Sequence, residues 1–125
     1  MTKKEITICG KQVTLAYCYS TEIGYKNLAG EEMADFVQES VNAIQSEKSP
    51  DIEKVIYAII AAMMAFYEDA DKMPVKDKDI MKDATPLEIG TALGTILGLR
   101  GEFYHIPKGE PEDKPEEKAE AEKNA

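Results

Sequence analysis

The sequence has few of the residues that build catalytic and metal sites: 125 residues include no tryptophan, one histidine and two cysteines. Cys9 and Cys18 are too few for a disulfide framework, and with His105 they do not reach the four ligands of a structural zinc site. His105 would act as a general base only beside a nucleophile or carboxylate, and no catalytic motif supplies one. We therefore expect no enzyme, no bound metal and no cofactor.

Long apolar runs and basic clusters are also missing. The longest apolar run, residues 55–66, is shorter than the roughly 18 residues of a membrane span. Residues 1–5 are not followed by the apolar segment of a secretory signal. Twenty-four acidic against fifteen basic residues give a net charge of -9, which opposes binding to a phosphate backbone. We expect a cytoplasmic protein whose partners include neither membrane nor nucleic acid.

What is present is enough apolar sequence for one folded domain. The chain is 43% apolar and 31% charged, which is typical of a globular protein. The exception is residues 107–125, with seven acidic residues, four lysines and three prolines but no aromatic or β-branched residue. Such a segment cannot bury enough apolar surface to offset its ordering entropy. The sequence predicts a body at 1–106 and a disordered acidic tail at 107–125.

Alternating residues predict a β-hairpin at the N-terminus. Ile6 and Ile8 precede residues 10–11, a glycine followed by a lysine, and Val13 and Leu15 follow them. A glycine first in a two-residue loop suits a tight hairpin turn. That loop would place Ile8 opposite Val13 and Ile6 opposite Leu15. Because a two-stranded ribbon alone is barely stable, we expect helices to cover its apolar face.

Helical periodicity and capping signals account for the rest of the body. We expect an α+β fold, mainly α, in which the hairpin packs on a bundle of about four to five helices. The first expected helix is short, capped by Ser20 or Thr21 and ended by Gly30, and the second begins at about Glu31. The third runs from the Ser49-Pro50-Asp51 start signal to about Tyr67. A short fourth helix lies near residues 79–82, and the last, at about 86–104, begins with a Thr85/Glu88 capping box.

The third predicted helix is apolar on nearly all sides. Besides its main apolar face it carries a second one, with Tyr57, Ile60 and Met64 as candidate partner-binding residues. All-round apolarity indicates either a central position in the core or a second face that binds a partner. A flexible methionine suits a surface that must accept varied sequences.

The last predicted helix contains a strip of four glycines: Gly90, Gly94, Gly98 and Gly101. On a helix of 3.6 residues per turn they lie within about 80° of one another. Each costs roughly 0.5 to 1 kcal/mol relative to alanine, so a close approach should offset them. Either another helix of this chain packs on the strip, or a second subunit or a client helix does.

Arg100 projects into the apolar stripe of the same helix. An unpaired buried charge is very costly, so we expect a carboxylate or carbonyl partner in a half-buried ion pair. Anion binding is the alternative, although no second basic residue lies nearby in the sequence.

Three segments together resemble one phage family: the hairpin at residues 6–15, the Tyr-Ser-Thr-Glu-Ile-Gly-Tyr segment at 19–25 and the Ala-Thr-Pro-Leu-Glu-Ile-Gly segment at 84–90. In these the chain is similar to the tail-assembly chaperones of long-tailed phages, in the form found in prophages. The resemblance implies a small, acidic, mainly helical protein of the bacterial host cytoplasm. It also implies two partners, the tape-measure protein that the chaperone coats and the tail-tube subunits that it recruits.

Two other function classes compete with this interpretation. The chain could be another phage structural or adaptor protein that acts as an oligomeric protein-binding module. A small-molecule enzyme would instead require a deep pocket with polar groups converging around Arg100 or His105.

Overall fold

An antiparallel hairpin begins the chain in the computed structural model, which describes residues 2–105. Strand β1 (Thr2–Ile8) pairs with β2 (Lys11–Tyr17), as predicted, but the register is different. Ile6 lies opposite Val13 and Ile8 opposite Lys11, so the predicted pairing of Ile8 with Val13 is wrong. The two-residue turn is formed by residues 9–10, one position earlier than expected. The apolar face is unchanged, because the pairing moves by two residues and side chains alternate with a period of two.

The turn lies at residues 9–10 because a distant carboxylate holds it there. Cys9 and Gly10 both have positive φ, 53° and 75°, as the turn type most suited to a hairpin requires. The backbone N–H of Cys9 donates to Glu88 Oε1 at 3.1 Å, and that of Gly10 donates to Glu88 Oε2 at 3.2 Å. Glu88 also accepts from the Thr85 N–H at 3.0 Å, which completes the predicted capping box. One side chain therefore joins the hairpin turn to the start of the last helix.

Residues 2–105 form five α-helices after the hairpin, which confirms the predicted fold class. They are α1 (Tyr19–Ala29), α2 (Met33–Gln45), α3 (Ile52–Tyr67), α4 (Asp77–Asp83) and α5 (Pro86–Tyr104), with a short 3-10 turn, η1 (Ala70–Lys72), before α4. Two predicted caps are wrong by a few residues. Cys18 precedes α1 in place of Ser20 or Thr21, and Asp51 rather than Ser49 caps α3 by accepting from the Lys54 N–H. The predicted disordered tail at 107–125 lies outside the described residues.

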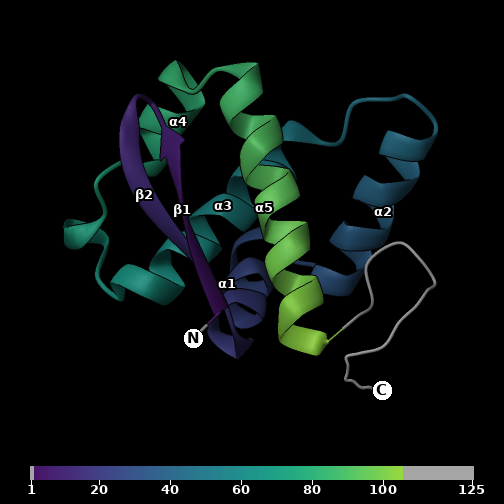
Figure 1. The fold of residues 1–125 in the computed structure, drawn as a ribbon, viewed down its shortest axis with the longest axis horizontal. Coiled ribbons are helices and arrows are strands. Elements are labelled where there is room, and N and C mark those ends of the chain that lie inside the picture. The colour runs from purple at the N-terminus through teal and green to yellow at the C-terminus, as the bar shows by residue number, and fades with distance from the viewer. Residues whose placement is uncertain (1, 106–125) are drawn as a thin grey trace.

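Helix α3 is the centre of the molecule (Figure 1). It packs against α1, β2, α4 and α5, and its alanines and Met63 are almost fully buried. At the crossing with α1, a methyl group placed on Gly24 would meet the Ala61 Cβ at 3.5 Å. The predicted central packing of this helix is thus confirmed, and small residues at Gly24 and Ala61 allow the backbones to approach.

Helix α5 crosses the front of the molecule beside the hairpin (Figure 1). Its Ala92, Ile96 and Leu99 side chains are buried in the core. Its N-terminal end is fixed by Glu88. At its C-terminal end the Tyr104 hydroxyl donates to Glu22 of α1 at 2.6 Å. Both ends of this helix are therefore tied to other elements.

Within residues 2–105, no helix combines the length and apolar character that crossing a bilayer demands.

The Glu88 contacts predict a specific pH dependence of stability. Hydrogen bonds from the backbone N–H groups of Thr85, Cys9 and Gly10 lower the pKa of Glu88 below its ordinary value. A carboxylate with a depressed pKa stabilises the fold fully above the unfolded pKa, about 4.3, and loses this contribution as the pH falls through the folded pKa. Glu88→Gln should therefore lower the melting temperature at pH 7, and the difference in melting temperature from the natural protein should narrow towards pH 3.

Glu102→Gln, on the same helix, is the matched control and should change the melting temperature little. Equal melting temperatures for Glu88→Gln and the natural protein at pH 7 would contradict this role.

Candidate partner-binding surfaces

The four glycines of α5 lie on the side of the helix that faces away from the core. At 100° per residue they are centred roughly opposite the buried Ala92, Ile96 and Leu99. Gly90 and Gly94 are exposed, and Gly98 and Gly101 are half-exposed. A methyl group placed on any of the four would meet no atom within 4 Å. Among the described residues, therefore, no other helix packs on the strip, and the expected close approach inside the chain is not found.

The helix segment that carries these glycines has few charged residues, and the charged side chains beside it are Lys4 and Glu102, which line a groove together with Gly94 and Gly98. Residues 89–99 include no charged side chain, although 31% of the chain is charged. Leu87, at the N-terminal end of the same face, has 80% of its surface exposed. Soluble proteins usually cover solvent-facing helix sides with charged residues. We call residues Leu87, Gly90, Gly94, Gly98 and Gly101 the glycine strip; it is about four helical turns long, and none of its own residues is charged.

The second face predicted on α3 is only partly open. Met64 is 38% exposed, and Tyr57 is half-buried with its hydroxyl donating to Glu53 at 3.1 Å. Ile60 is a core residue with only 9% of its surface exposed, so its side chain is not offered to a partner. What remains of this face is Tyr57 and Met64.

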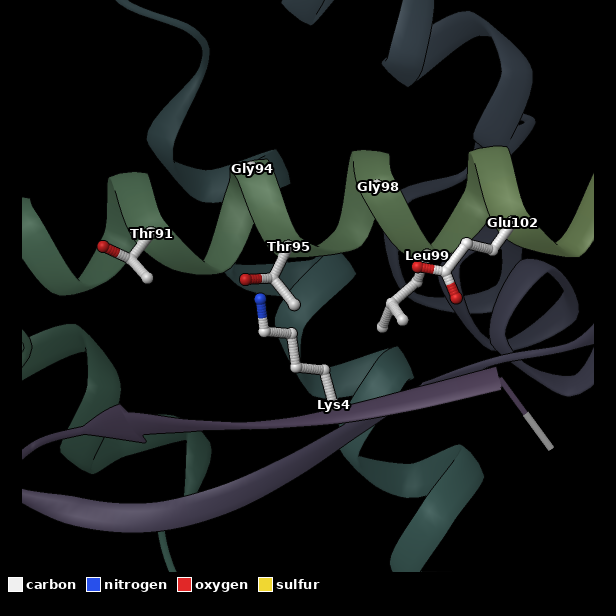
Figure 2. Close-up of a pocket in the computed structure, with 7 residues that line it drawn as sticks. All are labelled: Lys4, Thr91, Gly94, Thr95, Gly98, Leu99 and Glu102. Carbon is white, nitrogen blue, oxygen red and sulfur yellow. The ribbon is translucent and has the colours of Figure 1, made fainter. Parts of the chain in front are cut away.

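A groove of about 270 Å³ separates α5 from β1 (Figure 2). Lys4 of β1 extends across it towards Thr95, and Glu102 borders it near the C-terminal end of α5. The complete lining is Lys4, Thr91, Gly94, Thr95, Gly98, Leu99 and Glu102. Most of these side chains are small or absent, and neither Arg100 nor His105 is among them. The groove thus does not bring together the polar groups that the enzyme hypothesis required.

Arg100 does not make the ion pair that the sequence predicted. Within residues 2–105 no carboxylate forms a salt bridge with it, and its buried Nε atom has no hydrogen-bond partner. Its guanidinium instead lies over the Tyr104 ring, 5.0 Å from the centroid. A cation over an aromatic face is stabilised by the ring quadrupole, which partly replaces the missing carboxylate. His105 is exposed and ends α5 with a φ of 57°.

An aromatic cluster that the sequence analysis missed surrounds this end of α5. The Tyr17 and Tyr104 hydroxyls both donate to Glu22 Oε2, at 2.8 and 2.6 Å. The bond to Glu22, together with burial, raises the pKa of Tyr104 to about 12. Phe103 packs between Tyr17 and Tyr19, with ring centroids 5.6 and 5.1 Å away. These contacts fix α5 in place, and no local pattern links Glu22 to residues some 80 positions away.

Among residues 2–105, no three histidine, cysteine, aspartate or glutamate side chains gather closely enough to hold a metal ion. Comparison of the chain with family models, with curated proteins and with solved structures finds no match. The candidate binding surfaces described above are the glycine strip, the groove beside it, and Tyr57 with Met64 on α3.

The open space beside the glycines predicts that alanine stabilises the protein. Gly90 and Gly101 have no positive φ, and a methyl group at either position meets nothing. Gly90→Ala and Gly101→Ala should each raise the free energy of unfolding by about 0.5 to 1 kcal/mol, because alanine loses less backbone entropy in a helix. Chemical denaturation followed by circular dichroism measures this change. Destabilisation by alanine would indicate that the strip is tightly packed in solution, contrary to the structure.

Proposed function

We propose that this chain is a non-enzymatic tail-assembly chaperone that binds the tape-measure protein and tail-tube subunits through the glycine strip. The observation that carries the proposal is the uncovered strip. Its four glycines cost the helix about 2 to 4 kcal/mol relative to alanine, and nothing within residues 2–105 packs against them to offset it. A binding surface accounts for this cost, because glycines allow another backbone to come close.

The shape and charge of the strip suit a helical client. A long helix that is prone to aggregate needs its apolar stripe covered, and a strip of glycines next to an exposed leucine can cover it. Leu87 supplies an exposed apolar anchor at one end of the strip. The net charge of -9 elsewhere on the chain would keep a coated complex soluble through mutual repulsion.

The identity of the client comes from the resemblance of residues 6–15, 19–25 and 84–90 to tail-assembly chaperones. The structure supports the choice of surface, and the resemblance supports the choice of partner. Tyr57 and Met64 on α3 form a second, smaller candidate surface for the same client. Localisation in the host cytoplasm follows from the same proposal.

The proposal predicts that charge on the strip abolishes client binding without unfolding the chain. Gly90→Glu with Gly101→Glu places two carboxylates where the structure leaves open space, so the helical circular dichroism should be retained. Co-purification with the tape-measure protein should fall at least tenfold, since a buried unpaired carboxylate is costly. Met81→Glu is the matched control, because Met81 is 55% exposed on α4 and lies in neither candidate surface.

A second double variant separates the two candidate surfaces. Tyr57→Lys with Met64→Lys should abolish co-purification only if the α3 face binds the client. Retained co-purification by both double variants would reject both surfaces. If the natural chain fails to co-purify with the tape-measure protein at all, the chaperone proposal is rejected in favour of another adaptor function.

A further inference from the structure

The outer edge of β1 is unpaired among the described residues. In a hairpin with a two-residue turn, the residues flanking the turn form a hydrogen-bonded pair, here Ile8 and Lys11. The alternation then points the N–H and C=O groups of Lys3, Glu5 and Thr7 away from β2. Within residues 2–105, no hydrogen bond reaches these outward backbone groups.

The outer edge of β2 is protected, unlike that of β1. Thr14, which lies opposite Glu5, donates its N–H outward to the Tyr67 hydroxyl of α3 at 3.0 Å. This bond also confirms the alternation, because Thr14 and Glu5 must point their backbone groups in opposite directions. Natural proteins rarely leave a strand of seven residues open at one edge, since it is a template for pairing with another strand.

The groove between β1 and α5 borders a face of β1 rather than its hydrogen-bonding edge. The Lys4 side chain points into this groove and extends towards Thr95 (Figure 2). Side chains stand perpendicular to a sheet, whereas the outward N–H and C=O groups of Lys3, Glu5 and Thr7 lie in its plane. A strand added to the edge would therefore lie about 4.8 Å from β1 in the plane of the hairpin, outside the groove.

We propose that this edge pairs antiparallel with the same edge of a second copy, so that two hairpins form one four-stranded sheet across a two-fold axis at Lys4. In that register Lys3 lies opposite Glu5 of the partner subunit, and Glu5 lies opposite the partner's Lys3. Lys3 and Glu5 both direct their backbone N–H and C=O groups away from β2. The register that pairs the opposite charges therefore also forms backbone hydrogen bonds between the two copies. This register sets two opposite-charge pairs against one pair of lysines, whereas an axis at Glu5 would give a pair of glutamates and no opposite-charge pair.

Lys4 meets its own copy at the axis, and this like-charge pair opposes the two favourable pairs. Its side chain points into the groove towards Thr95 (Figure 2), and among the described residues it forms no ion pair. A further two strands also address a general weakness, because a two-stranded ribbon is barely stable and three or more strands are needed for an independent sheet. The inference does not depend on the identity of any client.

Charge reversal tests the register directly. Lys3→Glu or Glu5→Lys alone turns both opposite-charge pairs into like-charge pairs, whereas the double variant restores them with the signs exchanged. Sedimentation equilibrium of the full chain should show the natural protein at twice its 13.9 kDa mass. Each single variant should raise the dimer dissociation constant about tenfold, and the double variant should return it to within about threefold of the natural value.

The controls separate this edge from other surfaces. Gln12→Lys adds charge to β2, at a residue opposite Thr7 but away from the open edge, and should leave the dissociation constant unchanged. Circular dichroism verifies that each variant is folded. A natural chain that stays monomeric at all concentrations overturns the proposal, and so does a dimer that is indifferent to both single variants. Gly90→Glu with Gly101→Glu, which abolishes client binding under the proposed function, should leave the dimer intact because both glycines belong to α5 and not to the edge of β1.

Discussion

The carboxylate of Glu88 is the contact on which the arrangement of both candidate surfaces depends. It accepts hydrogen bonds from the backbone of Thr85 and from that of Cys9 and Gly10, which lie more than 70 positions earlier in the chain. A helix start and a tight turn both expose backbone N–H groups that need acceptors, and one carboxylate supplies them for both. Because the other end of α5 is held by Tyr104 and Glu22, the helix cannot easily rotate. Its buried side therefore stays buried, and its glycines stay outside.

Glycine has opposite roles on two helices of this protein. Gly24 of α1 lies against Ala61 of α3, where a small residue permits a close crossing inside the core. The glycines of α5 lie in open space, and no element within residues 2–105 makes a close approach to them. Periodicity identifies which residues share a helix face, but it does not decide which face points inward. The inward face of α5 is the one with the large apolar side chains of Ile96 and Leu99, because burying them stabilises the fold more than burying glycines does.

Local signals predicted the elements better than their junctions. The hairpin, the long helices and the Thr85 capping box follow from alternation, periodicity and capping chemistry, all within a few residues. The register of the hairpin does not, because a turn at residues 9–10 or at 10–11 satisfies the same apolar alternation. The acceptor that favours a turn at residues 9–10 is Glu88, nearly 80 residues away.

The contacts of Glu22 could not be predicted for the same reason, since its two tyrosine donors come from β2 and the end of α5. A carboxylate or carbonyl partner is predicted for Arg100 because burial usually demands one, yet its guanidinium lies over the Tyr104 ring.

The two proposed contacts belong to different elements. The dimer contact is the open edge of β1, and the client contact is the glycine strip of α5. Gly94 and Gly98 of the strip line the groove beside β1, whereas Gly90 and Gly101 lie outside that lining. On the two-fold axis proposed at Lys4, each copy would keep its own Gly90 and Gly101 free for a client. A dimer would then present two glycine strips, and a long helical client could engage both. Two weak contacts on one rigid body act as a single stronger one, because the second forms at high effective concentration. Dimerisation would thus allow a surface of only about four turns per subunit to hold a much longer client.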